Sequence, residues 1–252
     1  MAQSLSNLPV GAKVKFGKYS VNGEVAQAIT WLVVAKNHSG YPANSITLLT
    51  ERIVDMRCFD AAEPNAFFDD MKSYGLGKYE PSNIRQWLNS NLTSGWYSSK
   101  HTADQSPSSY YVSGGTPYEN RPGFLNAFTT DEINSIVTTP VLCHEYSGGY
   151  RTLSDKVFLP SLREISGTES EKFIYEGEQW GYFKSNETLS PLTQQAYTNS
   201  LSMLSPHRLM VIGIGGHVAR YGLLIMVTKI TFMVFATQVR PHLSYSVRMM
   251  VQ

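Results

Sequence analysis

Two apolar runs separated by a turn decide the fold: ITWLVVA at residues 29–35 and SITLLT at residues 45–50. The first is a continuous apolar run of strand length, as expected of a buried strand. Residues 37–44 between them read NHSGYPAN, in which Gly40 and Pro42 break regular structure. We therefore expect two strands that pair as a hairpin.

The segment before this hairpin predicts a further strand. Residues 10–19 read VGAKVKFGKY, which places Val14 and Phe16 in phase and Lys13 and Lys15 on the opposite side. Alternation of apolar and charged residues with a period of two is typical of a strand with one buried face. We expect an edge strand here.

Three polar residues mark the starts of short helices. Ser82 precedes the sequence NIRQWLN and is a favourable N-cap residue. Thr129 and Glu132 have the spacing of a capping box, and so do Ser161 and Glu164. We expect one short helix after each of these N-caps.

The remaining segments predict short strands and long loops. Residues 156–159 read KVFL and predict a strand, whereas residues 91–121 are rich in Ser, Gly, Tyr and Pro and predict a long loop. Short strands with few short helices are typical of an α+β fold. Large aromatic residues near the hairpin and the capped helices should form the core. These residues are Trp31, Trp87, Phe124, Phe128 and Phe158.

The composition excludes several classes of protein. The chain has 252 residues, with 21 Lys and Arg against 20 Asp and Glu, and a formal net charge of +1. This near-neutral balance argues against a nucleic-acid partner, because such proteins neutralise many phosphates. Aromatic residues make up 12%, too many for a disordered chain, and two cysteines are too few for a disulfide scaffold. No apolar signal-peptide stretch opens the sequence, so we expect a cytoplasmic or virion-associated protein.

The cysteines and histidines do not predict a catalytic or metal site. Cys143, His144 and Glu145 are adjacent, but neighbouring residues of a strand point to opposite faces and cannot chelate one ion together. Cys58 follows Arg57, whose charge can activate a thiol, yet free cysteines are usually buried, which favours a packed thiol. We expect no catalytic residues, no metal ligands and no cofactor, and we leave the ligand-binding residues open.

Two patterns near the C-terminus predict neither a nucleotide site nor a membrane span. The glycines of VIGIGGH at 211–217 do not have the spacing of a phosphate-binding loop. The apolar residues of 209–236 are interrupted by His217, Arg220 and Lys229. A span needs about 20 mostly apolar residues, so we expect none.

Five blocks in order along the chain carry a resemblance: ITWLVVA at 29–35, LLTERIVDMRCFD at 48–60, SNIRQWLNS at 82–90, RPGFLNAFTTDE at 121–132 and DKVFLPSLREI at 155–165. They resemble a family of uncharacterised domains of unknown function that is common in gut bacteria and their phages. That family is similar to the C-type-lectin and formylglycine-generating-enzyme fold. The resemblance implies a lectin-like body over 8–187. It also implies a C-terminal part that displays a variable ligand-binding face, as in similar proteins diversified by retroelements.

The resemblance stops at a change of composition. Residues 188–252 carry five Lys or Arg and no acid, and form an atypical C-terminal segment. The family pattern includes an aromatic strand of the type YWWxRSP, which is missing, and a closing GVRPAL strand, of which VRP remains at 239–241. With codons that the genetic code permits for residues 209–220, the reading frame that starts one nucleotide earlier can encode VNGYWYWWARSP, which has the expected aromatic pattern. Residues from about 200 to 238 are therefore either translated out of frame or naturally divergent.

An out-of-frame segment has not been selected to pack on the body. On that interpretation, residues 209–235 should form at most short or weakly paired strands. Several large side chains should stay exposed there, among them Met210, Met226, Met233 and Phe232.

These features together predict a non-catalytic module for ligand binding or surface display, associated with a phage or prophage. Its partner would be an unknown protein or glycan on a cell surface, and it could assemble as a homo-oligomer or in a virion. A structural virion component is one alternative. The other is an enzyme on the formylglycine-generating-enzyme-like fold, which needs Cys58 or Cys143 in an open cleft beside a base or a metal.

Overall fold

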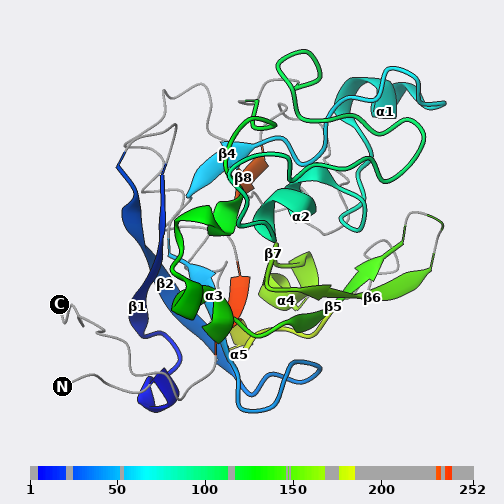
Figure 1. Ribbon diagram of the computed structural model, residues 1–252. Helices are drawn as coiled ribbons and strands as arrows, with labels where there is room; N and C mark the ends of the chain where they lie inside the picture. Colours follow the sequence, from blue (N-terminus) through cyan, green and yellow to red (C-terminus); the bar gives the residue numbers. More distant parts are fainter. Residues whose placement is uncertain are drawn as a thin grey trace, which may run out of the picture.

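The computed structural model describes residues 5–20, 25–51, 54–112, 117–145, 147, 149–167, 176–184, 231–233 and 236–239. Short helices and small antiparallel sheets give an α+β arrangement (Figure 1). The strands are β1 (Lys13–Tyr19), β2 (Gln27–Lys36), β3 (Ile46–Thr50), β4 (Asp55–Arg57), β5 (Thr139–His144), β6 (Tyr150–Asp155), β7 (Val157–Phe158), β8 (Thr231–Met233) and β9 (Ala236–Val239). The helices are η1 (Leu5–Asn7), α1 (Asp69–Tyr74), α2 (Asn83–Leu88), η2 (Phe124–Ala127), α3 (Thr130–Ser135), α4 (Leu162–Ser166) and α5 (Gly181–Lys184). None of the helices in these ranges is long and apolar enough to cross a lipid bilayer.

Five strands form the main sheet in the order β1-β2-β3-β9-β7, each antiparallel to its neighbours. β2 and β3 pair with Trp31 opposite Thr50, which confirms the predicted hairpin. β1 lies at the edge of the sheet, with Val14 and Phe16 buried and its lysines exposed, which confirms the predicted edge strand. The two smaller sheets pair β4 with β8 and β5 with β6.

β1 contains an irregularity between Lys15 and Lys18, where its register with β2 shifts. Gly17 lies within it at a φ of 64°, and its N–H donates to Oε1 of Glu132 in α3 at 3.0 Å. A Cβ at position 17 would lie 2.1 Å from Cε1 of Phe128. The absence of a side chain at this bulge therefore lets β1 approach the segment of η2 and α3.

Aromatic side chains form much of the core, as predicted. Trp31 donates its indole N–H to the carbonyl of Phe16 at 2.7 Å, so the polar atom of this buried ring is satisfied. The rings of Trp87 and Phe124 lie 5.5 Å apart between centroids. The five predicted core residues are each at most 6% exposed: Trp31, Trp87, Phe124, Phe128 and Phe158.

The three predicted N-caps are confirmed. The hydroxyl of Ser82 accepts a hydrogen bond from the backbone N–H three residues on, at the start of α2. Thr129 with Glu132, and Ser161 with Glu164, form complete capping boxes at the starts of α3 and α4. Each box satisfies backbone donors that have no partner within the helix.

The segment 91–121 is the predicted long loop, and its described residues contain neither helix nor strand. Trp96 anchors it: the indole N–H donates to the carbonyl of Arg121 at 2.9 Å, and the ring stacks on Tyr118 at 5.4 Å. Tyr118 is fully buried and donates its hydroxyl to the carbonyl of Cys58 at 2.9 Å. The loop therefore packs on the body.

Two strands come from the atypical C-terminal segment. β8 pairs with β4, and β9 lies between β3 and β7 in the main sheet. β8 is three residues long. Otherwise the predictions for 209–235, including those for the side chains of Met210, Met226, Met233 and Phe232, lie outside the described residues. The boundary at residues 187 and 188 stays a prediction.

Candidate functional site

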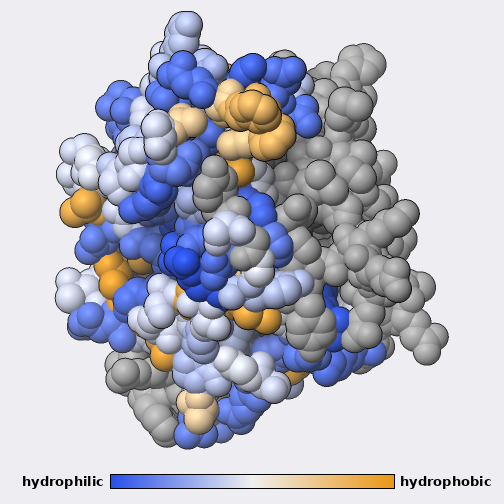
Figure 2. All heavy atoms as spheres, turned by 90° about the vertical axis from the view of Figure 1, so that its right-hand side faces the viewer, coloured by the Kyte–Doolittle hydropathy of each residue, from blue (hydrophilic) through white to orange (hydrophobic). Residues whose placement is uncertain are grey.

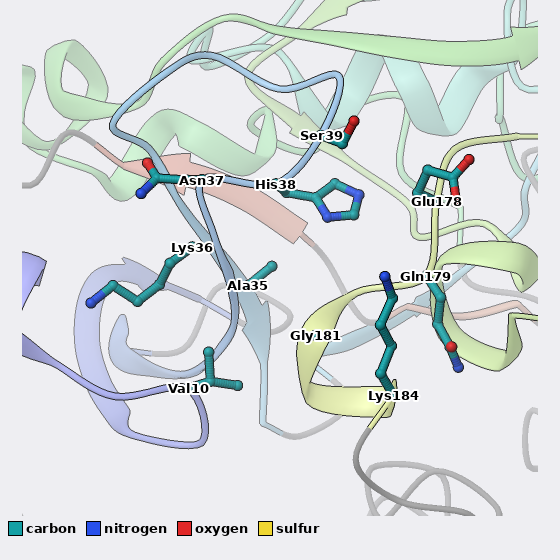
Figure 3. Close-up of a pocket in the computed structure, with 10 residues that line it drawn as sticks. All are labelled: Val10, Ala35, Lys36, Asn37, His38, Ser39, Glu178, Gln179, Gly181 and Lys184. Carbon is teal, nitrogen blue, oxygen red and sulfur yellow. The ribbon is translucent and has the colours of Figure 1, made fainter.

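A polar hollow lies where the end of β2 and the turn after it face the segment that leads into α5. Its volume is about 500 Å³. In Figure 3, the side chain of Lys184 rises from α5 toward the ring of His38, and Glu178 stands beside them. The lining residues are Val10, Ala35, Lys36, Asn37, His38, Ser39, Glu178, Gln179, Gly181 and Lys184.

Local features of both segments build this hollow. Asn37 leaves β2 at a φ of 49°, in the left-handed region that asparagine tolerates, and its N–H donates to the carbonyl of Ser45 at 2.9 Å. On the other side, Trp180 is fully buried and its backbone N–H donates to the carbonyl of Glu164 at 2.8 Å. Phe183 is also buried, so α5 is fixed against β2.

Opposite charges and neutral polar groups share the hollow. Burial lowers the pKa of His38, and the nearby Lys184 ammonium acts in the same direction, although Glu164 and Glu178 oppose it. The imidazole is therefore neutral at pH 7, and its ring packs against Tyr41 with centroids 4.8 Å apart. Its Nε2 is buried without a hydrogen-bond partner among the described residues. The hollow thus offers a cation, a carboxylate and neutral donors and acceptors to one small ligand.

Both cysteines are buried, which confirms the packed thiol predicted for Cys58. Cys58 is 6% exposed and Cys143 is 0% exposed. Burial, and after it the charge of Asp60, raises the pKa of Cys58 to about 12. A nucleophilic thiol must ionise and be reached by its substrate. Cys58 meets neither condition, and Cys143 does not meet the second.

The adjacent Cys143, His144 and Glu145 do not converge on one point. Nδ1 of His144 lies 2.7 Å from Nζ of Lys78, whereas Glu145 pairs with Arg151 at 3.3 Å. Burial, and then the charge of Lys78, lower the pKa of His144. Cys143 lies in the core, so the three side chains do not meet at one ion, and the period of the strand predicts opposite faces for Cys143 and His144.

The structure brings together a group that the sequence pattern did not reveal. Glu63, His101 and Asp104 place one ligand-type atom each within 4.8 Å of one another, and no other such group occurs in the described part of the chain. Burial, and then the Asp104 carboxylate, raise the pKa of Glu63 to about 7. Burial also raises the pKa of Asp104. These three residues could hold a metal ion, and the spacing His-x-x-Asp at 101–104 was the available local signal.

One family matches most of the chain. The sequence fits the family described as Domain of unknown function (DUF6273) over residues 44–219. No curated protein and no solved structure matches it. The matched range contains Glu63, His101 and Asp104, together with the α5 side of the polar hollow. The chain therefore belongs to the DUF6273 family, a family of domains of unknown function, as the resemblance of the five sequence blocks predicts.

Proposed function

We propose that the chain is a non-catalytic ligand-binding module with a lectin-like body, and that the polar hollow of Figure 3 binds a hydroxyl-rich ligand such as a cell-surface glycan. The proposal includes association with a phage or prophage. That part, like the lectin-like body, rests on the resemblance of the five sequence blocks.

The chemistry of the hollow supports this proposal. Sugar hydroxyls both donate and accept hydrogen bonds, so a site for them needs groups of both kinds. The Lys184 ammonium donates, the Glu178 carboxylate accepts, and the neutral imidazole of His38 has one donor and one acceptor nitrogen. The volume of about 500 Å³ lies within the range of small-ligand sites. This mixture of donors and acceptors in one hollow is the observation that carries the proposal.

The alternatives predict other properties. An enzyme that uses a cysteine, on the formylglycine-generating-enzyme pattern, needs an accessible thiol, and both cysteines are buried. A structural virion component would assemble into oligomers and would bind no glycan. Glycan binding therefore separates the proposed function from a purely structural role.

The proposal can be tested with the labelled full-length chain on a glycan array, followed by titration of the glycans that bind. We expect Lys184→Ala to weaken binding by about 10–100-fold, the value of one hydrogen bond from a charged group. Gln179→Ala should weaken it by a smaller factor.

Lys72→Ala is the matched control, because Lys72 is a lysine of α1, on another part of the surface (Figure 1). It should bind as the unchanged chain does. Absence of glycan binding, or equal losses in Lys184→Ala and Lys72→Ala, would overturn the proposal.

A further inference from the structure

Three ligand-type side chains from two distant segments meet below the surface. Glu63 follows β4, whereas His101 and Asp104 lie in the long loop 91–121. Nε2 of His101 and Oε1 of Glu63 are 3.3 Å apart, and all three ligand atoms lie within 4.8 Å of one another. The two segments occupy the same end of the molecule, where the loop runs beside α1 (Figure 1), and the N–H of Ala62 donates to the carbonyl of Tyr111 at 2.9 Å.

The state of Glu63 is a second observation that points to a ligand. Its side chain is 0% exposed, and neither carboxylate oxygen accepts a hydrogen bond of normal geometry from the described residues, although the N–H of Leu76, which donates to Asp60, lies close enough to lower the pKa of Glu63. A buried carboxylate without hydrogen bonds is costly, since buried charges in proteins are normally paired or coordinate a metal. Nε2 of His101 faces one of these oxygens and is buried, whereas other atoms of its side chain, which is 13% exposed as a whole, reach solvent.

Neighbouring groups hold one of the three ligands, Asp104, in place. Oδ2 of Asp104 accepts from the N–H of Lys100 at 2.6 Å, and Oδ1 accepts from the amide of Asn83 at 3.5 Å. Asn83 is the first residue of α2, and its own N–H donates to Asp60 at 3.0 Å. Hydrogen bonds of this kind around a metal site orient the ligands and raise the affinity of the site.

We infer that Glu63, His101 and Asp104 bind one divalent transition-metal ion of the Zn²⁺ class. Two ligands that each lie about 2.1 Å from a tetrahedral Zn²⁺ are roughly 3.4 Å apart. The separation of 3.3 Å between His101 and Glu63 fits this geometry. The ligand atom of Asp104 lies within 4.8 Å of the other two, so it would move toward a bound ion, and a water molecule would supply the fourth ligand. A histidine nitrogen beside carboxylates favours such a metal over Ca²⁺ and Mg²⁺, which take oxygen ligands.

A bound ion would attach the long loop 91–121 to the segment that follows β4. The ligands on either side of the ion belong to the loop and to the segment after β4, so the ion links two segments that are far apart in the sequence. Metal bound only in the folded state adds its binding free energy to stability. The competing arrangement is a simple ion pair between a protonated His101 and Glu63, which needs no metal.

Titration of the metal-free full-length chain with Co²⁺, followed by displacement with Zn²⁺, tests the inference. We expect one Co²⁺ per chain with the visible absorption of a four-coordinate site, and loss of that absorption when Zn²⁺ is added. Glu63→Gln and His101→Ala should each weaken Zn²⁺ binding by at least about tenfold. Zn²⁺, but not Mg²⁺, should raise the melting temperature of the unchanged chain.

His144→Ala is the matched control, because His144 is a partly buried histidine outside the cluster; it should bind Zn²⁺ as the unchanged chain does. Diethyl pyrocarbonate labelling of the unchanged chain serves if a variant fails to fold. Zn²⁺ should then protect His101, but not His144, from modification. Lack of Zn²⁺ binding, binding unaffected by Glu63→Gln and His101→Ala, or no protection of His101 would overturn the inference.

Discussion

Replacing Gly17 by alanine should destabilise the fold more than the same replacement at Gly40. Both glycines have a positive φ, 64° and 81°, so alanine is strained by about 1–2 kcal/mol at either position. The space around them differs. A Cβ at position 17 would lie 2.1 Å from Phe128, whereas nothing lies within 4 Å of a Cβ at position 40.

The packing of Phe128 sets the size of the difference. Its ring lies 5.7 Å from that of Phe16 and 5.6 Å from that of Phe124, so it cannot turn aside freely. An extra carbon forced into a packed core costs about 1–3 kcal/mol. We therefore expect a loss of about 2–5 kcal/mol in the unfolding free energy for Gly17→Ala, against about 1–2 for Gly40→Ala.

Urea unfolding followed by tryptophan fluorescence measures both losses, provided that the slope of free energy against urea is unchanged. A second replacement, Phe128→Leu, should recover part of the loss in Gly17→Ala and none of the loss in Gly40→Ala, because neighbouring sites couple and distant ones do not. Equal losses at Gly17 and Gly40 would refute the close approach of β1 to Phe128.

Three further predictions concern charge and the thiols. Asp155→Asn should lower the free energy of unfolding by about 2–4 kcal/mol in the same urea titration, because it leaves Arg85 without the carboxylate that it contacts at 2.9 Å. An unchanged free energy of unfolding would contradict this pairing. Cys58 and Cys143 should react with a thiol-specific disulfide reagent at pH 8 only after unfolding, because both are buried, and fast labelling of the native chain would show an accessible thiol. The pKa of His38 is lower in the folded than in the unfolded chain, so the unfolded chain binds more protons and stability falls as the pH drops below about 6.5. The melting temperature of the His38→Gln variant should therefore fall less between pH 7 and pH 5 than that of the unchanged chain.

Sequence reasoning succeeded where the pattern is local. The hairpin of β2 and β3 follows from two apolar runs with a Gly and Pro turn, and both lie within about 20 residues. Capping boxes span four residues, so Thr129 and Ser161 could be recognised directly. The burial of Trp31 and Trp87 follows from their size and from the elements that carry them.

The sequence analysis missed helices and strands that bury few side chains, because only a buried face makes the spacing of apolar residues periodic. α1 has no buried residue and therefore shows no apolar face in the sequence. β6 exposes Tyr150, Arg151 and Thr152 in succession, so it does not read as an alternating strand. β5 is an exception, because it does bury every second residue, but Pro140 and the apolar Leu142 on its other face hide that alternation in the sequence. β5 and β6 are regular because they pair with each other. The residues of either strand alone do not predict that pairing.

The group of Glu63, His101 and Asp104 was missed for a different reason. Its members come from irregular chain, where no period predicts the direction of a side chain. The packing of the long loop through Trp96 and Tyr118 brings them together, and that packing is a tertiary contact.

β9 has an inner place in the main sheet, although it comes long after its neighbour β3 in the sequence. During synthesis β3 leaves the ribosome long before β9, so one side of β3 carries N–H and C=O groups with no strand beside it. Such an open edge can pair with a strand of another nascent chain. A product that stops before residue 236 would keep this edge permanently. A chaperone that covers β3 until release should therefore raise the yield of native protein.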